Sequence, residues 1–370
     1  MNTGILKFGK HLFKGISFGS LKNNQGEIVF TTSLTSYVET LSDPSYKNQI
    51  LVFTQPLIGN YGVPSRIKEN KLFKNFESDK IHASGIIVND YSAKYSHWNS
   101  VESLSDWCKR DNIPALTNID TRYVTNLIRE HGTVNAEILC NENNTNQNNT
   151  NPNENNTHPN ENNIIKDISI KKECIYNQNG ILKIAVIDCG VKQSIIKLLI
   201  KRNIRVHLLP YNCDINIYDY EGIIISNGPG SPQIKCLIET TKKIINDKKI
   251  IPLFNICLGH QILGLAAGFN IYKMKHGHRS HNSPVINTYN GSCKISSQNH
   301  SYCISNKYIP KNWFVSFINA NDNSIEGIKH SYLPYSSVQF HPESNGGPND
   351  FEYLFDDFID ECLIFKKSNN

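Results

Sequence analysis

The fold is decided by one stretch of this 370-residue sequence, Ile251-Pro-Leu-Phe-Asn-Ile-Cys257-Leu-Gly259-His-Gln261. The residues before Cys257 are almost all apolar, as in a buried strand, and the apolar residues after it suit a helix packed on a sheet. Cys257 is therefore expected where a strand turns into a helix. Free backbone N–H groups and the positive end of the helix dipole favour the thiolate there, which is the nucleophilic form of cysteine.

Strands and helices alternate through the second half of the chain. Apolar strands are predicted at 181–188, 205–209, 222–226 and 250–256, and helices at 192–202, 234–247 and 350–365. This alternation indicates an α/β fold with an open, mostly parallel sheet flanked by helices. The first half has mostly short strands, with helices at 103–110 and 122–130, so a smaller strand-rich domain precedes the α/β domain.

A base for the thiol is offered by the segment Ser337-Val-Gln-Phe-His341-Pro-Glu343, where a strand-like run ends in a histidine. His341 can accept the thiol proton, and Glu343 can hold the imidazole in the useful tautomer. Each residue alone is weak evidence, because a cysteine after an apolar strand is often a small core residue and a histidine is often structural. The combination indicates a Cys/His/Glu relay.

A third element, Gly222-Ile-Ile-Ile-Ser-Asn-Gly228-Pro-Gly230, is an apolar strand that runs into a glycine-rich turn. Glycines let several backbone N–H groups point into one concavity, which can bind a developing oxyanion. An ordinary strand-ending turn would have the same composition.

The three elements, in this order, resemble the class I glutamine amidotransferase domain. In that family the cysteine attacks the side-chain amide of glutamine, forms a glutamyl thioester and releases ammonia. Residues 26–46, 49–60 and the run Ile119-Asp-Thr-Arg122 resemble the N-terminal domain of the carbamoyl phosphate synthetase small subunit. The implied domains are 1–140, the small-subunit N-terminal domain, and 181–370, the amidotransferase domain, with a linker and connector at 141–180.

The resemblance implies roles for individual residues. Cys257 would be the nucleophile, His341 the base and acid, and Glu343 its orienting partner. The residues that would hold glutamine or stabilise the oxyanion are Ser33, Gly228, Gly230, Leu258 (through its backbone N–H), Gln261, Asn299, Ser301 and Tyr302.

Four positions depart from the family's usual residues. Glycine is usual where Asn255, Ser280 and Ser301 stand, and histidine where Ser283 stands. If Ser280 or Ser301 needed a positive φ, strain of about 1–3 kcal/mol would follow. We expect an active site nevertheless, because the three relay residues are present.

The resemblance also implies a partner. The chain has no G-x-x-x-x-G-K-[ST] phosphate loop, so it is expected to hold no cofactor itself, while a large subunit uses ATP and Mg²⁺. This chain would hydrolyse glutamine, and ammonia would pass through an internal tunnel to the large subunit of a heterodimer. Carbamoyl phosphate made there would feed arginine and pyrimidine biosynthesis.

Composition excludes several other classes of protein. The net charge of +5 is mild, and no basic run or basic–aromatic repeat indicates nucleic-acid binding. The ten cysteines form no C-x-x-C pair, so no metal site is predicted. There is no apolar run of 18 residues and no leader, so neither a membrane protein nor a secreted one is expected. The abundance of Asn, Ile and Lys favours a plastid-encoded protein of the stroma or a bacterial cytoplasmic one.

Residues 141–163 are rich in asparagine and nearly devoid of apolar side chains, which predicts a disordered linker. Its three Asn-x-Thr triplets, at Asn143, Asn148 and Asn155, are not expected to be glycosylated without a secretory signal.

Two other functions stay open on the sequence alone. One is a non-catalytic assembly subunit, in which the departures at Asn255, Ser280 and Ser301 have ruined the pocket. The other is a thiol hydrolase, or an amidotransferase that serves a different synthase, although the domain that contains Ser33 argues against it.

Overall fold

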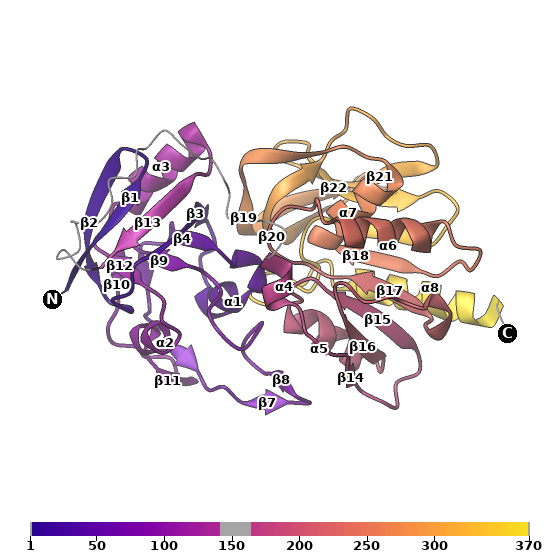
Figure 1. The fold of residues 1–370 in the computed structure, drawn as a ribbon, viewed down its shortest axis with the longest axis horizontal. Helices are drawn as coiled ribbons and strands as arrows, with labels where there is room; N and C mark the ends of the chain where they lie inside the picture. The colour runs from indigo at the N-terminus through magenta and orange to yellow at the C-terminus, as the bar shows by residue number, and fades with distance from the viewer. Residues whose placement is uncertain (1, 141–163, 369–370) are drawn as a thin grey trace. The chain divides into compact units, whose positions relative to one another are not determined.

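The computed structural model describes residues 2–140 and 164–368, and the chain divides into two compact units. One unit comprises residues 1–68 and 73–161, and the other comprises 69–72 and 162–370. Figure 1 draws the first unit in indigo to magenta and the second in magenta to yellow. The predicted disordered linker at 141–163 and its Asn-x-Thr triplets lie outside the described residues.

A closed barrel of seven strands forms the N-terminal unit. In barrel order the strands are β1 (Thr3–Phe8), β13 (Asn135–Leu139), β3 (Asn24–Thr31), β4 (Gln49–Phe53), β9 (Gly85–Ile87), β12 (Ala115–Thr117) and β2 (His11–Ser17). Three short two-stranded sheets pair β10 (Asp90–Tyr91) with β5 (Leu57–Ile58), β11 (Ser100–Glu102) with β6 (Val63–Pro64), and β7 (Lys68–Glu69) with β8 (Leu72–Phe73).

Alternation of side chains along the barrel strands gives this unit two hydrophobic clusters. Along β4, Ile50 and Val52 pack with the helix α3 (Thr121–His131), whereas Leu51 and Phe53 pack with α1 (Tyr37–Ser42) and α2 (Leu104–Arg110). Successive strand residues point to opposite faces, so one strand contributes to both clusters. The two helices predicted here from the sequence are confirmed as α2 and α3, with starts within one residue.

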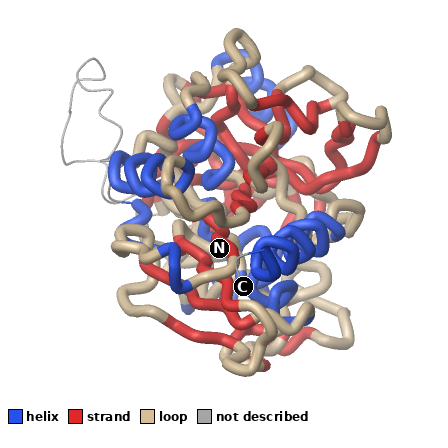
Figure 2. The backbone as a smooth tube through the Cα atoms, turned by 90° about the vertical axis from the view of Figure 1, so that its right-hand side faces the viewer, coloured by secondary structure: helices blue, strands red, loops and turns tan. Residues whose placement is uncertain are grey.

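The C-terminal unit is built on a ten-stranded sheet whose centre is parallel. The five parallel strands are, in order, β16 (Arg205–Pro210), β15 (Lys183–Asp188), β17 (Gly222–Ile225), β18 (Leu253–Ile256) and β23 (Tyr335–Val338). Helices α5 (Gln193–Lys201) and α8 (Tyr353–Ser368) pack on one hydrophobic cluster, and α6 (Lys235–Ile245) and α7 (Leu258–Ala267) pack on the other. In Figure 2, α8 is the long blue helix that ends near the C label. The predicted α/β fold class is confirmed.

An antiparallel half extends this sheet beyond β23. Its strands, in order, are β22 (Ile325–His330), β21 (Trp313–Asn319), β19 (Ile271–Asn287) and β20 (Cys293–Ile304). The sequence analysis predicted no strands here, because β19 and β20 are rich in histidine, serine and asparagine rather than in apolar residues. The sheet is therefore mixed, with the predicted parallel strands at its centre.

Residues 164–180, which the sequence analysis assigned to the connector, belong to the C-terminal unit. They form the helix α4 (Ile164–Ile168) and the strand β14 (Cys174–Tyr176), which pairs antiparallel with β16. Ile165 is buried in the same cluster as α6 and α7.

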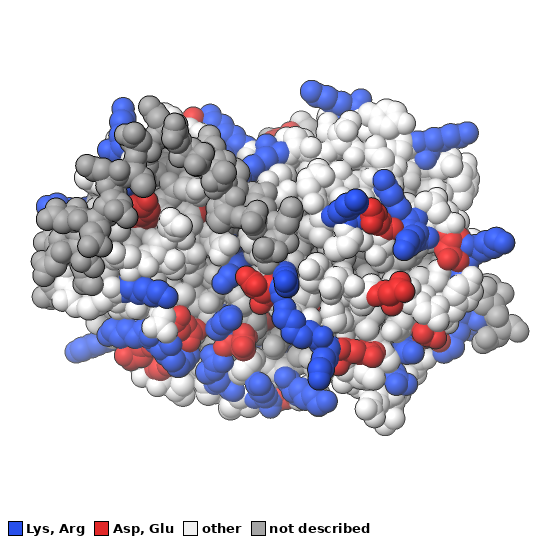
Figure 3. Space-filling model, viewed as in Figure 1, with Lys and Arg blue, Asp and Glu red and all other residues white. Residues whose placement is uncertain are grey.

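On the face drawn in Figure 3, acidic and basic side chains lie intermixed, in keeping with the small net charge of +5.

Candidate active site

Cys257 lies at a sharp turn between β18 and α7, as the sequence predicted. Its backbone has φ 54° and ψ −103°, and a non-glycine residue at positive φ costs about 1–3 kcal/mol. The turn is held because the Cys257 N–H donates to the Val338 carbonyl at 2.8 Å and the Gln261 N–H donates to the Cys257 carbonyl at 3.1 Å. The neighbouring strand and the first helical turn therefore impose the strain.

Gly259 allows α7 to start this close to the sheet. A Cβ atom at this position would lie 2.1 Å from the Ile225 carbonyl oxygen, which is backbone and cannot move aside. The Gly259 N–H donates to the Ser226 carbonyl at 3.2 Å. The helix that carries Cys257 is therefore seated directly on the end of β17.

His341 and Glu343 form the predicted pair beside β23. The Nδ1 atom of His341 lies 2.6 Å from Oε1 of Glu343, and both side chains are buried. The Nε2 atom of His341 is buried and makes no hydrogen bond within the described part of the chain. Burial alone would lower the pKa of His341, but the nearby charges of Glu343 and Cys257 raise it to about 10. The imidazole therefore carries a positive charge next to Glu343.

Lys192 is a fourth member of this charged group that the sequence analysis did not name. Its Nζ atom lies 2.9 Å from Oε1 of Glu343, and its side chain is 7% exposed. Burial would raise the pKa of Glu343, yet the charges of Lys192 and His341 lower it to about 2. The carboxylate thus stays charged at the centre of a buried ion group. The position of Lys192 in the sequence could have pointed to it, because Lys192 follows the carboxyl end of β15 as Cys257 follows that of β18.

The glycine-rich loop after β17 lies at the same edge of the sheet as Cys257. It is fixed to the segment after β15, because the Cys189 N–H donates to Ser226 Oγ at 3.0 Å and the Lys192 N–H donates to Asn227 Oδ1 at 3.1 Å. A Cβ atom on Gly228 would lie 2.0 Å from the Cys189 carbonyl oxygen, so only glycine fits there. Gly230 has φ 88°, which glycine adopts freely. The carboxyl ends of parallel strands are where ligands bind in open α/β sheets.

Several predicted glutamine contacts surround the nucleophile within the C-terminal unit. The Asn299 carbonyl oxygen lies 3.6 Å from Sγ of Cys257. Gln261 donates from Nε2 to the Tyr302 carbonyl at 3.0 Å and to Oε1 of Gln339 at 3.1 Å. Gln339 was not among the residues predicted from the sequence. Leu258, next to Cys257, is buried at the first position of α7.

Ser33 belongs to the N-terminal unit, where it follows β3. It is 5% exposed, and its Oγ accepts a hydrogen bond from Thr31 Oγ1 at 3.0 Å. Its role in holding glutamine stays a prediction.

The four departures from the family pattern have partners in the structure. Neither Ser280 nor Ser301 is among the described residues with positive φ, so the backbone strain considered for them does not arise. The hydroxyls of Ser280 and Ser283 hydrogen-bond to each other, and Ser301 Oγ accepts from Nη2 of Arg279. Asn255 accepts the Ile225 N–H on its Oδ1 at 2.9 Å and thereby links β18 to β17.

The α/β unit, with its buried cysteine at a strand–helix turn, is what the resemblance to class I glutamine amidotransferases implied, and the family models assign the chain to that class. The family model "Glutamine amidotransferase class-I" matches residues 185–361, and "Carbamoyl-phosphate synthase small chain, CPSase domain" matches residues 5–138. The chain belongs to the carbamoyl phosphate synthase small chain family. It is a glutamine amidotransferase, the small-chain type of glutamine-hydrolysing carbamoyl phosphate synthase.

Individual relatives agree with the family models. The carbamoyl phosphate synthase arginine-specific small chain of Schizosaccharomyces pombe is 44% identical, over 96% of this chain and 86% of its own length. That of Candida albicans is 42% identical, over 97% of this chain and 84% of its own. Among solved structures, a glutamine amidotransferase from Thermotoga maritima has 18% identity and a TM-score of 0.38, over 50% of this chain and 85% of that one.

The expected plastid or bacterial origin gains no support from these fungal relatives. Within the described residues, no helix is both long enough and apolar enough to span a bilayer.

Proposed function

We propose that this chain hydrolyses glutamine through a covalent glutamyl thioester on Cys257 and supplies the ammonia to a large subunit. The observation that carries the proposal is the arrangement of Cys257, His341 and Glu343 at one edge of the sheet, with the His341–Glu343 hydrogen bond of 2.6 Å. The names of the relatives, which are small chains, support a large-subunit partner, and the term "arginine-specific" in those names supports a role in arginine biosynthesis.

The first half of the reaction forms the thioester. The Cys257 thiolate attacks the side-chain amide carbon of glutamine, and the amide oxygen becomes an oxyanion. Backbone N–H groups of Leu258 and of the loop at Gly228 and Gly230 stabilise this charge. His341 then gives its proton to the leaving nitrogen, and ammonia departs as the C–N bond breaks.

The second half releases glutamate. His341, now neutral, takes a proton from a water molecule, which attacks the thioester carbon and expels the Cys257 sulfur. Glu343 keeps Nδ1 of His341 in place through both halves, and Lys192 keeps Glu343 charged. Gln261, Asn299, Ser301 and Tyr302 are the residues of the C-terminal unit that hold glutamine in this proposal.

Ammonia then passes to the large subunit, which binds ATP, Mg²⁺ and bicarbonate and makes carbamoyl phosphate. This chain needs no cofactor of its own in the proposed reaction, because each proton transfer is assigned to His341.

The test is Cys257→Ser in the complex with the large subunit. We expect glutamine-dependent synthesis of carbamoyl phosphate to be lost and ammonia-dependent synthesis to be kept, since only the glutaminase step uses the thiol. A glutamine-analogue electrophile should label Cys257 in the unchanged protein, as read by peptide mass spectrometry. Labelling of a different cysteine would show that Cys257 is not the nucleophile. A wild-type complex that is inert with glutamine but active with ammonia would instead favour the non-catalytic assembly subunit.

A further inference from the structure

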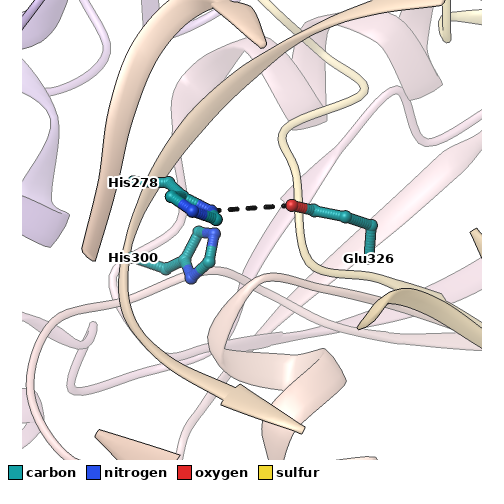
Figure 4. A group of neighbouring side chains, drawn as sticks. All are labelled: His278, His300 and Glu326. Atoms are coloured by element: carbon teal, nitrogen blue, oxygen red, sulfur yellow. Dashed lines mark ion pairs between the residues drawn. The ribbon is translucent and has the colours of Figure 1, made fainter. Parts of the chain in front are cut away.

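A partly buried charged cluster lies next to the segment of β20 that carries Asn299 and Tyr302. It consists of His278 on β19, Glu326 on β22 and Asp322 in the turn before β22. The Nε2 atom of His278 lies 2.9 Å from Oδ2 of Asp322, and its Nδ1 lies 3.7 Å from Oε1 of Glu326. Glu326 is fully buried, and Figure 4 shows its carboxylate directed at the ring of His278.

His300 connects this cluster to the segment around Asn299. His278 and His300 are directly opposed in the β19–β20 pairing, and their rings meet edge to face with centroids 5.0 Å apart. Nδ1 of His300 lies 2.9 Å from the Tyr302 carbonyl oxygen, and its Nε2 lies 2.9 Å from Oε1 of Gln298. The ring of His300 thus braces residues 298–302 from within.

The braced segment contacts the catalytic centre at two points. The Asn299 carbonyl oxygen faces Sγ of Cys257 at 3.6 Å, and the Tyr302 carbonyl accepts from Gln261 at 3.0 Å. A second route leads from the same cluster, because the Gln339 N–H donates to the Glu326 carbonyl at 2.8 Å and Gln339 also accepts from Gln261.

The same residues could be mistaken for a metal site, since ligand atoms of His278, His300 and Glu326 all lie within 4.8 Å of one another. The hydrogen bonds argue against it. Both ring nitrogens of His300 already have partners, as does Nε2 of His278. Among these three residues, only Nδ1 of His278 and Oε2 of Glu326 have no hydrogen-bond partner in the described structure. Two available atoms are too few for zinc, which takes four ligands in structural sites.

We propose that His278, held between Asp322 and Glu326, is a positioning residue for glutamine binding. It fixes the ring of His300 and, through it, the backbone of Asn299 and Tyr302. The charges support this arrangement: burial would lower the pKa of His278, but the two carboxylates raise it to about 9, so the ring carries a positive charge that neutralises Glu326. The inference rests on the proposed function, because it assumes that these backbone groups contact glutamine.

The experiment uses the complete complex and three variants, His278→Asn, Glu326→Gln and Asp322→Asn. The first two changes break the ion pair between His278 and the buried carboxylate of Glu326, so KM for glutamine should rise about tenfold, while kcat changes less than about threefold. The side chain of Asp322 is 41% exposed, so Asp322→Asn should give a smaller rise in KM for glutamine. Because this position is exposed, the variant also tests the proposal if the two buried variants fail to fold. Glu361→Gln, at the ion pair with Lys329 on the same unit, is the matched control and should leave KM unchanged.

The outcomes separate the inference from the proposed function. In one outcome, the wild-type protein is labelled at Cys257 and hydrolyses glutamine, and the variants fold and have a normal KM. This result would overturn the positioning role alone. A lower amount of labelled enzyme at unchanged KM would show a merely structural role and overturn it as well. If mass spectrometry finds stoichiometric zinc or manganese in the wild-type protein and none in His278→Asn, the cluster is a metal site and the positioning role is wrong. An unchanged protein without labelling or glutaminase activity would defeat the proposed function instead.

Discussion

At the scale of single residues, the site depends on how the buried side chains of Lys192, His341 and Glu343 share charge. Glu343 lies between the cations Lys192 and His341, at 2.9 Å and 2.6 Å. Breaking a buried ion group by removing one partner costs more than the group contributes as a whole, because the remaining charge is left without compensation. Replacing any one of the three residues is therefore expected to be costly.

His341 and Glu343 should act unequally. His341 moves protons in both halves of the proposed reaction, so His341→Asn should lower kcat by about a thousandfold or more. Glu343 only orients and charges the imidazole, so Glu343→Gln should cost less. Steady-state glutaminase assays of the complex measure both. Equal and mild losses would contradict the relay.

The pH dependence of stability should report the same carboxylate. The pKa of Glu343 is lowered from 4.5 to about 2, so its charged form stabilises the folded state above pH 4.5, and this contribution is lost as the pH falls towards 2. The thermal midpoint of the unchanged protein should therefore exceed that of Glu343→Gln near neutral pH, and the gap should narrow below pH 4.5. Calorimetry across pH 3–7 measures the gap, and a constant difference would show that Glu343 is not held ionised.

At the scale of elements, the strand β18 is tied to β17 by a side chain. The two strands pair in register at Ile223 and Leu253, and the Asn255 Oδ1 atom accepts the Ile225 N–H further along. In the assembly-subunit alternative drawn from the sequence, Asn255 is one of the departures that ruin the pocket. The structure instead gives it a bond that holds the strand leading to the nucleophile.

Asn255→Gly should consequently destabilise the protein rather than activate it. The change leaves the buried Ile225 N–H without its acceptor, which costs about 1–3 kcal/mol, and glycine in a strand costs up to about 1 kcal/mol more. Thermal unfolding and glutaminase assays are the measurements, with Asn255→Ala separating the lost bond from the added backbone freedom. A higher midpoint together with a faster enzyme would show instead that the Asn255 side chain disturbs the pocket.

At the scale of the whole molecule, the boundary of the C-terminal unit predicts how fragments behave. A fragment that starts at residue 181 lacks α4 and β14 and leaves β16 as an exposed sheet edge, which favours aggregation. A fragment of residues 164–370 keeps both elements and should show a higher thermal midpoint and a larger monomer fraction in gel filtration. Equal behaviour of the two fragments would mean that residues 164–180 add nothing to the unit.

The sequence predicted the parts of this molecule whose signal is local. The buried strands β15, β17 and β18 are continuous apolar runs, and Cys257 stands between such a run and a helix. Each of these features can be recognised within a dozen consecutive residues. Lys192 and Gln339 were missed because their partners come from elements far away in the chain. Strands β19 and β20 were missed because their polar side chains hydrogen-bond to one another instead of packing in a hydrophobic core.

The hydroxyl pair of Ser280 and Ser283 couples the two positions. Both residues are 8% exposed, and each is the other's hydrogen-bond partner. Replacing either serine by alanine leaves the other buried hydroxyl without this partner, and a buried polar group without a partner costs about 1–3 kcal/mol. The effects of the two replacements are therefore not additive: changing both serines should cost less than the sum of the two single changes.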